Sequence, residues 1–540
     1  MTGFATHLVD NQPPPFGAHD LWQGDAVLRE AVAREGASHA AARIAAYGAL
    51  AGGELLALSH DAHRDRPRLR THDPSGERLD AVEFHPHYHR IMDAAIAHGV
   101  AGLSWAEPVP GAHVARAALS YLHYQAEPGS SCPLTMTHAA VPVLAREPAL
   151  HEWVRKVAAC RYDARDLPMA EKHGVTLGMG MTEKQGGSDV RANATIATPL
   201  AGGDGYLLRG HKWFFSAPMS DGFLVLAQAP GGLTCFLLPR RLPDGDRNGF
   251  RLMRLKDKLG DWSNASSEVE FDQAHAWRVG AEGRGIATIL EMVMLTRLDC
   301  MLGSAGLMRM ALSQALHHCR HRRAFGKALI DQPLMRNVLA DLAVEAEAAL
   351  AVSMRVARAV DAAPRDPREA AFARIATAIG KFHVCKRAPG FVNEAQECLG
   401  GAGYVEESLL PRLYRQAPLN SIWEGSGNIQ CLDVLRALSR EPEAGAALLA
   451  ELESVSGRDG DFDAAFAGLR EMLAAAPAEA GARRLVEAMA QLLQAAVLLR
   501  AGSPVAAVFC RSRLGGRGGA YGTLPPETPF DTLLARALGD

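Results

Sequence analysis

The sequence predicts a mainly helical protein with a β domain in the middle of the chain. Apolar residues recur every three to four positions up to about residue 180, β-rich runs separated by turn residues fill 181–282, and helical spacing returns from 283. The 540 residues are too many for one compact core. A helix–sheet–helix order also disfavours a parallel α/β fold. We therefore expect several domains in that order.

Two domains are predicted in the first half of the chain. Residues 1–180 form an N-terminal helical domain, because segments such as DAVLREAVAREGASHAAARIAAYGALAG carry the helical apolar repeat. Residues 181–282 form a small antiparallel β domain, because runs such as GYLLRGHKWFFSAP and FLVLAQAPGGLTCFLLP are strand-like and bounded by turn residues.

Two helical units are predicted after the β domain. Residues 283–440 contain segments long enough to be the helices of a C-terminal four-helix bundle. Residues 441–540 are rich in Ala and Leu until about Phe509 and then rich in Gly and Arg. This last stretch is predicted to be an additional helical domain.

The composition is typical of a globular protein. A net charge of −3 gives no general attraction to nucleic acid or anionic membranes, and we expect no signal peptide and no membrane span. Nine scattered cysteines without a Cys-x-x-Cys pair favour a reducing cytoplasm over a disulfide or zinc module. Two histidine groups are interpreted as solvated or helix-surface side chains, so no metal site is predicted: His85, His87 and His89, and His317, His318 and His321.

Two motifs of the β region carry possible chemistry. In GMGMTEKQGGSDV (178–190), paired glycines before Ser188 and Asp189 allow backbone N–H groups to approach an anion such as a pyrophosphate. A glycine-rich turn between domains is the alternative. In GHKWFFS (210–216), aromatic side chains could cover a flat ring while Ser216 makes a hydrogen bond, and core packing is the alternative. No P-loop, Gly-x-Gly-x-x-Gly or Gly-x-Ser-x-Gly motif is present.

A third motif lies in the second helical region. Glu424 stands between Trp423 and the flexible Gly425-Ser426-Gly427. A carboxylate beside an aromatic ring in a dry cleft has a raised pKa and serves as a base near neutral pH. The alternative is a carboxylate that complements the dipole of a helix beginning at Asn428.

In this order and domain context, the motifs resemble those of the acyl-CoA dehydrogenase family over about residues 85–440. MTEKQGGSDV, KLGDWSNASSEVEFD, RRAFG, LGGAGY and IWEGSGNIQ are each similar to a signature of that family. The resemblance implies a helical N-terminal domain, a β middle domain and a C-terminal bundle around FAD. It also implies a homotetramer built as a dimer of dimers.

The resemblance assigns roles to individual residues. Glu424 would remove the proton α to a thioester carbonyl while a β-hydride passes to flavin N5. Some relatives place this base on an earlier helix, but here that stretch, MLTRLDC, offers Thr296, so Glu424 is the single candidate. Arg322 and Gly400-Gly401 would meet the adenine-diphosphate half of FAD, often across a subunit interface. The implied cofactor-binding residues are Met181, Thr182, Gly187, Ser188, Phe214, Ser216, Arg322, Gly400, Gly401, Trp423, Gly425, Ser426 and Asn428.

Within the family, the sequence is most similar to the alkylation-response subgroup, whose extra C-terminal domain has the same placement. That likeness implies binding of double-stranded DNA, protection of DNA from alkylating agents and at most weak dehydrogenase activity. Residues 441–540 hold nine Arg and no Lys against 13 Asp and Glu, yet several arginines gather near its end. The candidate DNA-binding residues are Arg436, Arg440, Arg511, Arg513 and Arg517. A solvated, disordered loop is the alternative for the Gly- and Arg-rich run.

Two other functions remain open. An ordinary acyl-CoA dehydrogenase would use Glu424 on a short or branched acyl-CoA and ignore DNA. A scaffolding protein that has lost its cofactor is less favoured, because Thr182, Ser188, Ser216 and Glu424 are all present.

Overall fold

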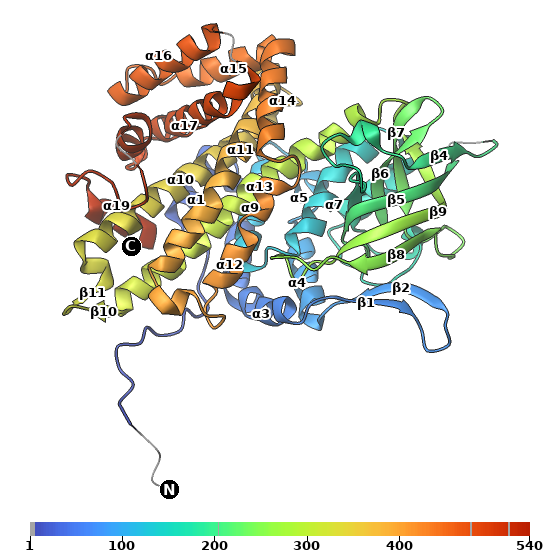
Figure 1. Cartoon of the computed structure of the whole chain (residues 1–540), viewed down its shortest axis with the longest axis horizontal. Coiled ribbons are helices and arrows are strands. Elements are labelled where there is room, and N and C mark those ends of the chain that lie inside the picture. The colour runs from blue at the N-terminus through green and yellow to red at the C-terminus, as the bar shows by residue number, and fades with distance from the viewer. Residues whose placement is uncertain (1–5, 203–204, 476–477, 517–518, 540) are drawn as a thin grey trace.

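The computed structural model describes residues 6–202, 205–475, 478–516 and 519–539. Helices build the first part of the chain, a β domain stands at one side, and long helices lead into a further helical layer (Figure 1). The predicted fold class is confirmed.

The N-terminal part is helical, as predicted, with one exception. An antiparallel hairpin, β1 (Arg68–His72) and β2 (Arg78–Glu83), interrupts it. Asp73 closes the turn by accepting hydrogen bonds from the backbone N–H groups of Ser75 and Glu77, and Gly76 takes a φ of +91°. The prediction of helix alone was therefore wrong for this segment. The helices are α1 (Ala26–Arg34), α2 (Ala41–Leu50), α3 (Leu56–Arg64), α4 (Pro86–Ala97), α5 (Leu103–Ala106), α6 (Ala112–Ala126), α7 (Ser131–Leu144) and α8 (His151–Ala158).

One helical stretch in this part, Ser38–Arg64, is long and apolar enough by length and composition to cross a membrane. Ile44, Tyr47 and Leu55 in this stretch are fully buried inside the protein. Of the most apolar 18-residue window in this stretch, 39% is buried inside the protein, so the expectation that the chain has no membrane span stays a prediction.

The middle domain is a seven-stranded sheet in which β6, β4, β5, β9 and β7 pair around a closed ring. Most pairings are antiparallel, as predicted, but β6 pairs in parallel with β3 and with β4. Phe215, Phe223 and Phe250 fill the interior. The strands are β3 (Leu177–Gly180), β4 (Ile196–Pro199), β5 (Gly205–Ser216), β6 (Gly222–Ala229), β7 (Gly232–Pro239), β8 (Phe250–Leu255) and β9 (Ser266–Val279).

Long helices form the predicted bundle. Helices α9, α10 and α11 pack on one another, α6 packs on α9 and α10, and α14 packs on α11. Small residues permit close contact: a Cβ on Gly380 of α11 would lie 2.2 Å from Met301 Cε of α9. The elements are α9 (Gly285–His321), β10 (Arg323–Ala324), β11 (Lys327–Ala328), α10 (Pro333–Ala362), α11 (Pro367–Glu397), α12 (Leu410–Gln416), α13 (Leu419–Ile422) and α14 (Gly427–Arg440).

The C-terminal segment is docked on the bundle by a shared core. Buried residues from α17 and α19, such as Leu493 and Leu534, belong to the same apolar cluster as α9, α10 and α11. The sequence prediction of helix only until about Phe509 missed α19, which packs on α10. The helices are α15 (Pro442–Glu453), α16 (Gly460–Ala474), α17 (Ala482–Ala501), α18 (Ala506–Phe509) and α19 (Phe530–Leu538).

Arg513 ties this segment to α10. Its guanidinium pairs with Asp341 and Glu345, both buried, and 12% of its own side chain is exposed. Residues 510–514 form a helical turn, which corrects the expectation of a flexible Arg-rich run at this point. Arg511, by contrast, pairs with the exposed Glu527 at 3.0 Å.

We expect Arg513→Ala to lower the free energy of unfolding by about 2–4 kcal/mol, because it removes one partner of buried carboxylates. Arg511→Ala, the matched control two residues away, should change it by no more than about 0.5 kcal/mol. Urea unfolding followed by circular dichroism measures both. Equal effects of the two substitutions would contradict the docking role of Arg513.

Candidate active site

Glu424 lies in a short loop between α13 and α14. Side chains of the neighbouring helices α11 and α14 donate hydrogen bonds to the backbone carbonyls of this loop. Glu424 and Gly425 both have left-handed conformations, with φ of +58° and +90°. The buried ammonium of Lys381 on α11 donates to the carbonyl oxygens of Trp423, at 2.7 Å, and Gly425. The Gln430 amide donates to the carbonyls of Glu424 and Gly425 at 3.0 and 2.9 Å. These hydrogen bonds fix the loop in place. They hold Glu424 in a left-handed backbone conformation that costs free energy for a non-glycine residue.

The carboxylate of Glu424 is directed at helix α9. Thr296 Oγ1 donates to Glu424 Oε2 at 2.6 Å, and Arg297 Nε donates to the Glu424 carbonyl at 3.1 Å. Arg297 is itself held by Asp433 at 2.7 Å. No side chain caps the N-terminus of α14, so the geometry favours the base hypothesis over a carboxylate that only complements a helix dipole. Through this hydrogen bond Thr296 orients the Glu424 carboxylate.

Burial raises the pKa of Glu424 above its ordinary value, while the Thr296 hydrogen bond and the charges of Lys381 and Arg297 oppose that rise. The residue keeps partial exposure, so a substrate can reach the carboxylate. A carboxylate with a raised pKa is a stronger base than a free glutamate.

The glycine-rich motif forms the loop after β3. Met181 and Thr182 are half-buried, and Gly187 and Ser188 are exposed. A Cβ on Gly187 would lie 2.7 Å from Thr182 Oγ1, so the close approach requires glycine. The motif lies within the β domain, between β3 and β4, which corrects the alternative of a turn between domains.

A buried ion pair that the sequence did not reveal anchors this loop. Lys212 Nζ on β5 lies 2.7 Å from Glu183 Oε1, and both side chains are fully buried. Glu183 also accepts hydrogen bonds from the Thr195 hydroxyl and the Ala194 N–H, at 2.6 and 2.7 Å. Lys212 and these hydrogen bonds bring the pKa of Glu183 to about 2, although burial alone would raise it. The only sequence signal for this ion pair was the presence of Glu183 within the glycine-rich motif.

The second motif divides its aromatic residues between two faces of β5. Phe215 is fully buried in the barrel core, whereas Phe214 is 53% exposed. Ser216 lies on the same face as Phe214, 3.2 Å from the Ser266 hydroxyl. Lys256 covers the ring of Phe214 at 4.6 Å. The packing interpretation is therefore confirmed for Phe215, whereas covering of a flat ring by Phe214 stays a prediction.

The loop, the strand and the base meet at one place. Met181 and Trp423 pack against the same buried cluster, which includes Cys132 of α7 and Ala217 at the end of β5. Gly425, Ser426 and Asn428 follow directly at the start of α14, and the Asn428 side chain accepts a hydrogen bond from Arg483. The structure thus gathers most of the predicted cofactor-binding residues at one end of the bundle.

Arg322, Gly400 and Gly401 lie at the opposite end of the long helices. Arg322 follows the last residue of α9, 26 residues after Thr296, a distance of roughly 39 Å along a helix. Gly400 follows α11, and the Cys319–Cys398 contact brings the two helix ends together. One chain alone therefore does not bring these three residues to Glu424.

The candidate DNA-binding residues differ in availability. Arg436 and Arg440 are exposed on α14, and Arg511 is exposed but paired with Glu527. The expectation that Arg513 is available is wrong, since its guanidinium is taken up by Asp341 and Glu345. Arg517 lies outside the described residues.

The histidine groups also differ. His317 Nε2 contacts the Pro14 carbonyl and His321 Nδ1 contacts the His317 carbonyl, as expected for helix-surface side chains. The prediction is wrong for His318, which is buried. In the other group, His85, His87 and Asp61 place possible ligand atoms within 4.8 Å of one another.

Three family models cover most of the chain. They match the adaptive response protein AidB N-terminal domain at residues 11–164, the acyl-CoA dehydrogenase middle domain at 178–274 and the acyl-CoA dehydrogenase C-terminal domain at 283–439. The chain belongs to the acyl-CoA dehydrogenase family. It is a flavin-dependent, acyl-CoA dehydrogenase-like oxidoreductase whose cofactor is FAD.

Individual relatives differ in the share of this chain that their similarity covers. The putative acyl-CoA dehydrogenase AidB of Escherichia coli is 49% identical over 99% of this chain and 98% of its own length. The cyclohexane-1-carbonyl-CoA dehydrogenase of Geobacter metallireducens is 28% identical over 48% of this chain and 67% of its own. The solved structure of Caenorhabditis elegans ACDH-11 with C11-CoA has a TM-score of 0.88 and 27% identity, covering 95% of this chain and 94% of that one.

The residues at the site fit FAD. Because Gly187 has no side chain, its backbone is accessible next to Thr182. Thr182 and Ser216 offer hydroxyl groups, and Phe214 offers an exposed aromatic face. The chemistry that FAD supplies when bound is acceptance of a hydride from the β-carbon of a thioester. The chain's own contacts hold Glu424 in place, where its carboxylate would take up the α-proton if the base hypothesis is correct.

We expect Glu424→Gln to slow exchange of the α-protons of a bound acyl-CoA with solvent deuterium by about 10²–10⁴-fold. The amide still accepts the Thr296 hydrogen bond, so FAD content measured by absorbance should not change. NMR of the thioester measures this proton transfer separately from hydride transfer. Exchange at the unaltered rate would show that another group is the base.

Thr296→Val should move the acid limb of the same exchange reaction toward higher pH. The Thr296 hydrogen bond lowers the pKa of Glu424, so its loss raises that pKa, and the base is active only when deprotonated. We expect a severalfold slower exchange near pH 6 and little change near pH 9. Thr296→Ser, which keeps the hydroxyl, is the matched control. A Val variant with the unaltered pH profile would contradict the role of Thr296.

Proposed function

We propose that this chain is an AidB-like flavoprotein that binds double-stranded DNA in the cytoplasm and protects it from alkylating agents, with weak acyl-CoA dehydrogenase activity. The observation that carries this proposal is the extent of the likeness to AidB. It runs through the N-terminal domain and the C-terminal segment, whereas the likeness to the Geobacter enzyme covers about half of the chain.

The C-terminal segment supports a role beyond acyl-CoA oxidation. It follows α14, which carries the exposed Arg436 and Arg440, and its helices pack on α10, α11 and α14. Docking on the bundle keeps such a surface rigid relative to the flavin site. Because Arg513 is buried in ion pairs, we place the phosphate contacts on α14 and on Arg511, and not on Arg513.

A homotetramer is part of the proposal. Arg322 and Gly400-Gly401 lie far from Glu424 in the same chain, so a second copy is the natural source of such residues at each flavin site. Large apolar side chains are exposed at that end of the bundle: Phe325 by 98%, Leu334 by 83% and Tyr404 by 83%. Burial between copies would remove them from water.

Titration of the purified yellow protein with duplex DNA at two salt concentrations tests DNA binding. We expect affinity to fall steeply with salt and to depend little on sequence. Arg436→Ala/Arg440→Ala should reduce the salt slope by about 2, because two phosphate contacts are lost. Arg155→Ala, an exposed arginine on α8, is the control and should leave the slope unchanged.

The ordinary acyl-CoA dehydrogenase remains the second candidate, because the complete Glu424 site favours it. It predicts rapid flavin reduction by one short or branched acyl-CoA and no DNA binding at either salt concentration. That pair of results would overturn the DNA-protection proposal.

A further inference from the structure

One cavity in the molecule is lined by arginines and shares no residue with the predicted flavin site. It has a volume of about 200 Å³, and its charged lining consists of five arginines and two aspartates: Arg78, Arg240, Arg241, Arg247, Arg251, Asp80 and Asp166. We call it the arginine pocket. It shares no residue with the loop after β3, the outer face of β5 or the Glu424 loop.

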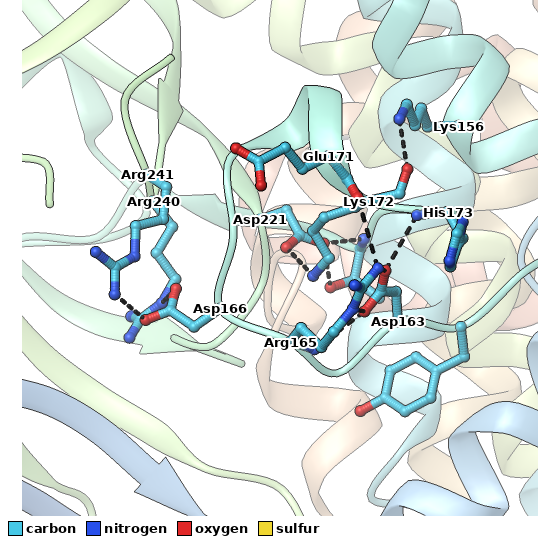
Figure 2. Close-up of polar contacts among 12 residues, drawn as sticks. Lys156, Asp163, Arg165, Asp166, Glu171, Lys172, His173, Asp221, Arg240 and Arg241 are labelled. Atoms are coloured by element: carbon cyan, nitrogen blue, oxygen red, sulfur yellow. Dashed lines mark hydrogen bonds and ion pairs between the residues drawn. The ribbon is translucent and has the colours of Figure 1, made fainter. Parts of the chain in front are cut away.

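Three parts of the chain meet at the arginine pocket. Arg78 and Asp80 belong to β2 of the N-terminal hairpin, Asp166 to the connection between α8 and β3, and the other arginines to β8 and the segment between β7 and β8. Figure 2 shows Asp166 between this connection and the side chains of Arg240 and Arg241. A ligand here would contact both the N-terminal part and the β domain.

The inner wall of the arginine pocket is preorganised. Arg240 is 7% exposed, and its guanidinium donates to Asp166 Oδ1 at 3.1 Å, to the Pro218 carbonyl at 3.0 Å and to the Asp80 carbonyl at 2.9 Å. Arg241 donates to the other oxygen of Asp166 at 2.9 Å. These two arginines bring the pKa of Asp166 to about 2 although burial alone would raise it. One carboxylate therefore serves two guanidinium groups.

The rim of the arginine pocket is formed by Arg247 and Arg251, for which the described part of the chain offers no carboxylate at ion-pair distance. Asp80 pairs with Arg78 at 2.8 Å, but Arg247 donates, through Nη1, to the backbone carbonyls of Arg78 and Leu79. Burial and the positive charges of Arg241 and Arg240 lower the pKa of Arg247, although the charges of Asp166 and Asp80 oppose this shift. The charged lining therefore has an excess of three positive charges around empty volume.

We propose that the arginine pocket binds a small phosphate-bearing anion, either inorganic phosphate or a phosphate monoester. Guanidinium groups in a fixed arrangement match the oxygens of a phosphate and bind it through pairs of charge-assisted hydrogen bonds. The volume is below that of typical pockets for drug-sized ligands, which favours a small anion over a nucleotide-sized one. Bound phosphate would neutralise the rim and join the hairpin to the β domain.

Isothermal titration of the FAD-loaded protein with inorganic phosphate or glycerol 3-phosphate, each against chloride at equal ionic strength, tests this proposal. We expect saturable binding of at least one phosphate probe at one site per chain. Arg247→Ser/Arg251→Ser should weaken it by about tenfold or more. These rim arginines have no carboxylate partner among the described residues, so the variant should keep its FAD content and unfolding midpoint. Arg209→Ser, an exposed arginine on β5 outside the pocket, is the matched control.

Comparison of the two probes identifies the source of the phosphate. Tighter binding of the ester indicates a phosphorylated metabolite, and tighter binding of the inorganic ion indicates free phosphate. Binding no stronger than that of chloride, or equal affinity in the rim variant and the control, would overturn the proposal. Loss of duplex DNA binding in the rim variant, without binding of either probe, would overturn it in favour of a nucleic-acid surface.

Discussion

The buried ammonium of Lys381 holds the backbone on both sides of Glu424. A left-handed glutamate costs roughly 1–3 kcal/mol, and hydrogen bonds from a charged donor to the neighbouring carbonyls offset a cost of that size. In this conformation the carboxylate is directed at Thr296 on α9 and stays partly exposed. Glu424 is therefore positioned by the interior of the bundle, because Lys381, Thr296 and Arg297 all belong to its long helices.

The same long helices separate the two ends of the predicted cofactor site. Thr296 and Glu424 lie at the end next to the β domain, whereas Arg322 and Gly400 lie where α9 and α11 finish. A helix of 37 residues cannot bring its two ends to one ligand. In the proposed homotetramer another copy of the chain would present the far-end residues, and the exposed Phe325 and Tyr404 are candidates for that contact.

Local patterns in the sequence predicted the order of domains, the β5 strand and Glu424, because each depends on spacing or on a short motif. Partners distant in the sequence could not be predicted. The Glu183–Lys212 pair joins residues 29 positions apart, and the Thr296–Glu424 hydrogen bond joins residues 128 apart. Composition favoured a flexible loop at Arg513, but its two carboxylate partners lie on α10, about 170 residues earlier in the chain. The β1–β2 hairpin was missed because its short strands lie inside a helical region.

Arg513, Arg240, Arg241 and Arg247 differ in how many carboxylates pair with each guanidinium group, and this number indicates the role of each. Arg513 has two buried carboxylates and serves as a structural tie. Arg240 and Arg241 share one carboxylate, and Arg247 beside them donates hydrogen bonds to backbone carbonyls. Since a buried or crowded cation without a counter-charge is costly, a cavity lined in this way is stabilised when an anion enters it. Arg436 is exposed on α14 and does not line this cavity, so weak contact with a polyanion suits it better than tight binding of a small ion.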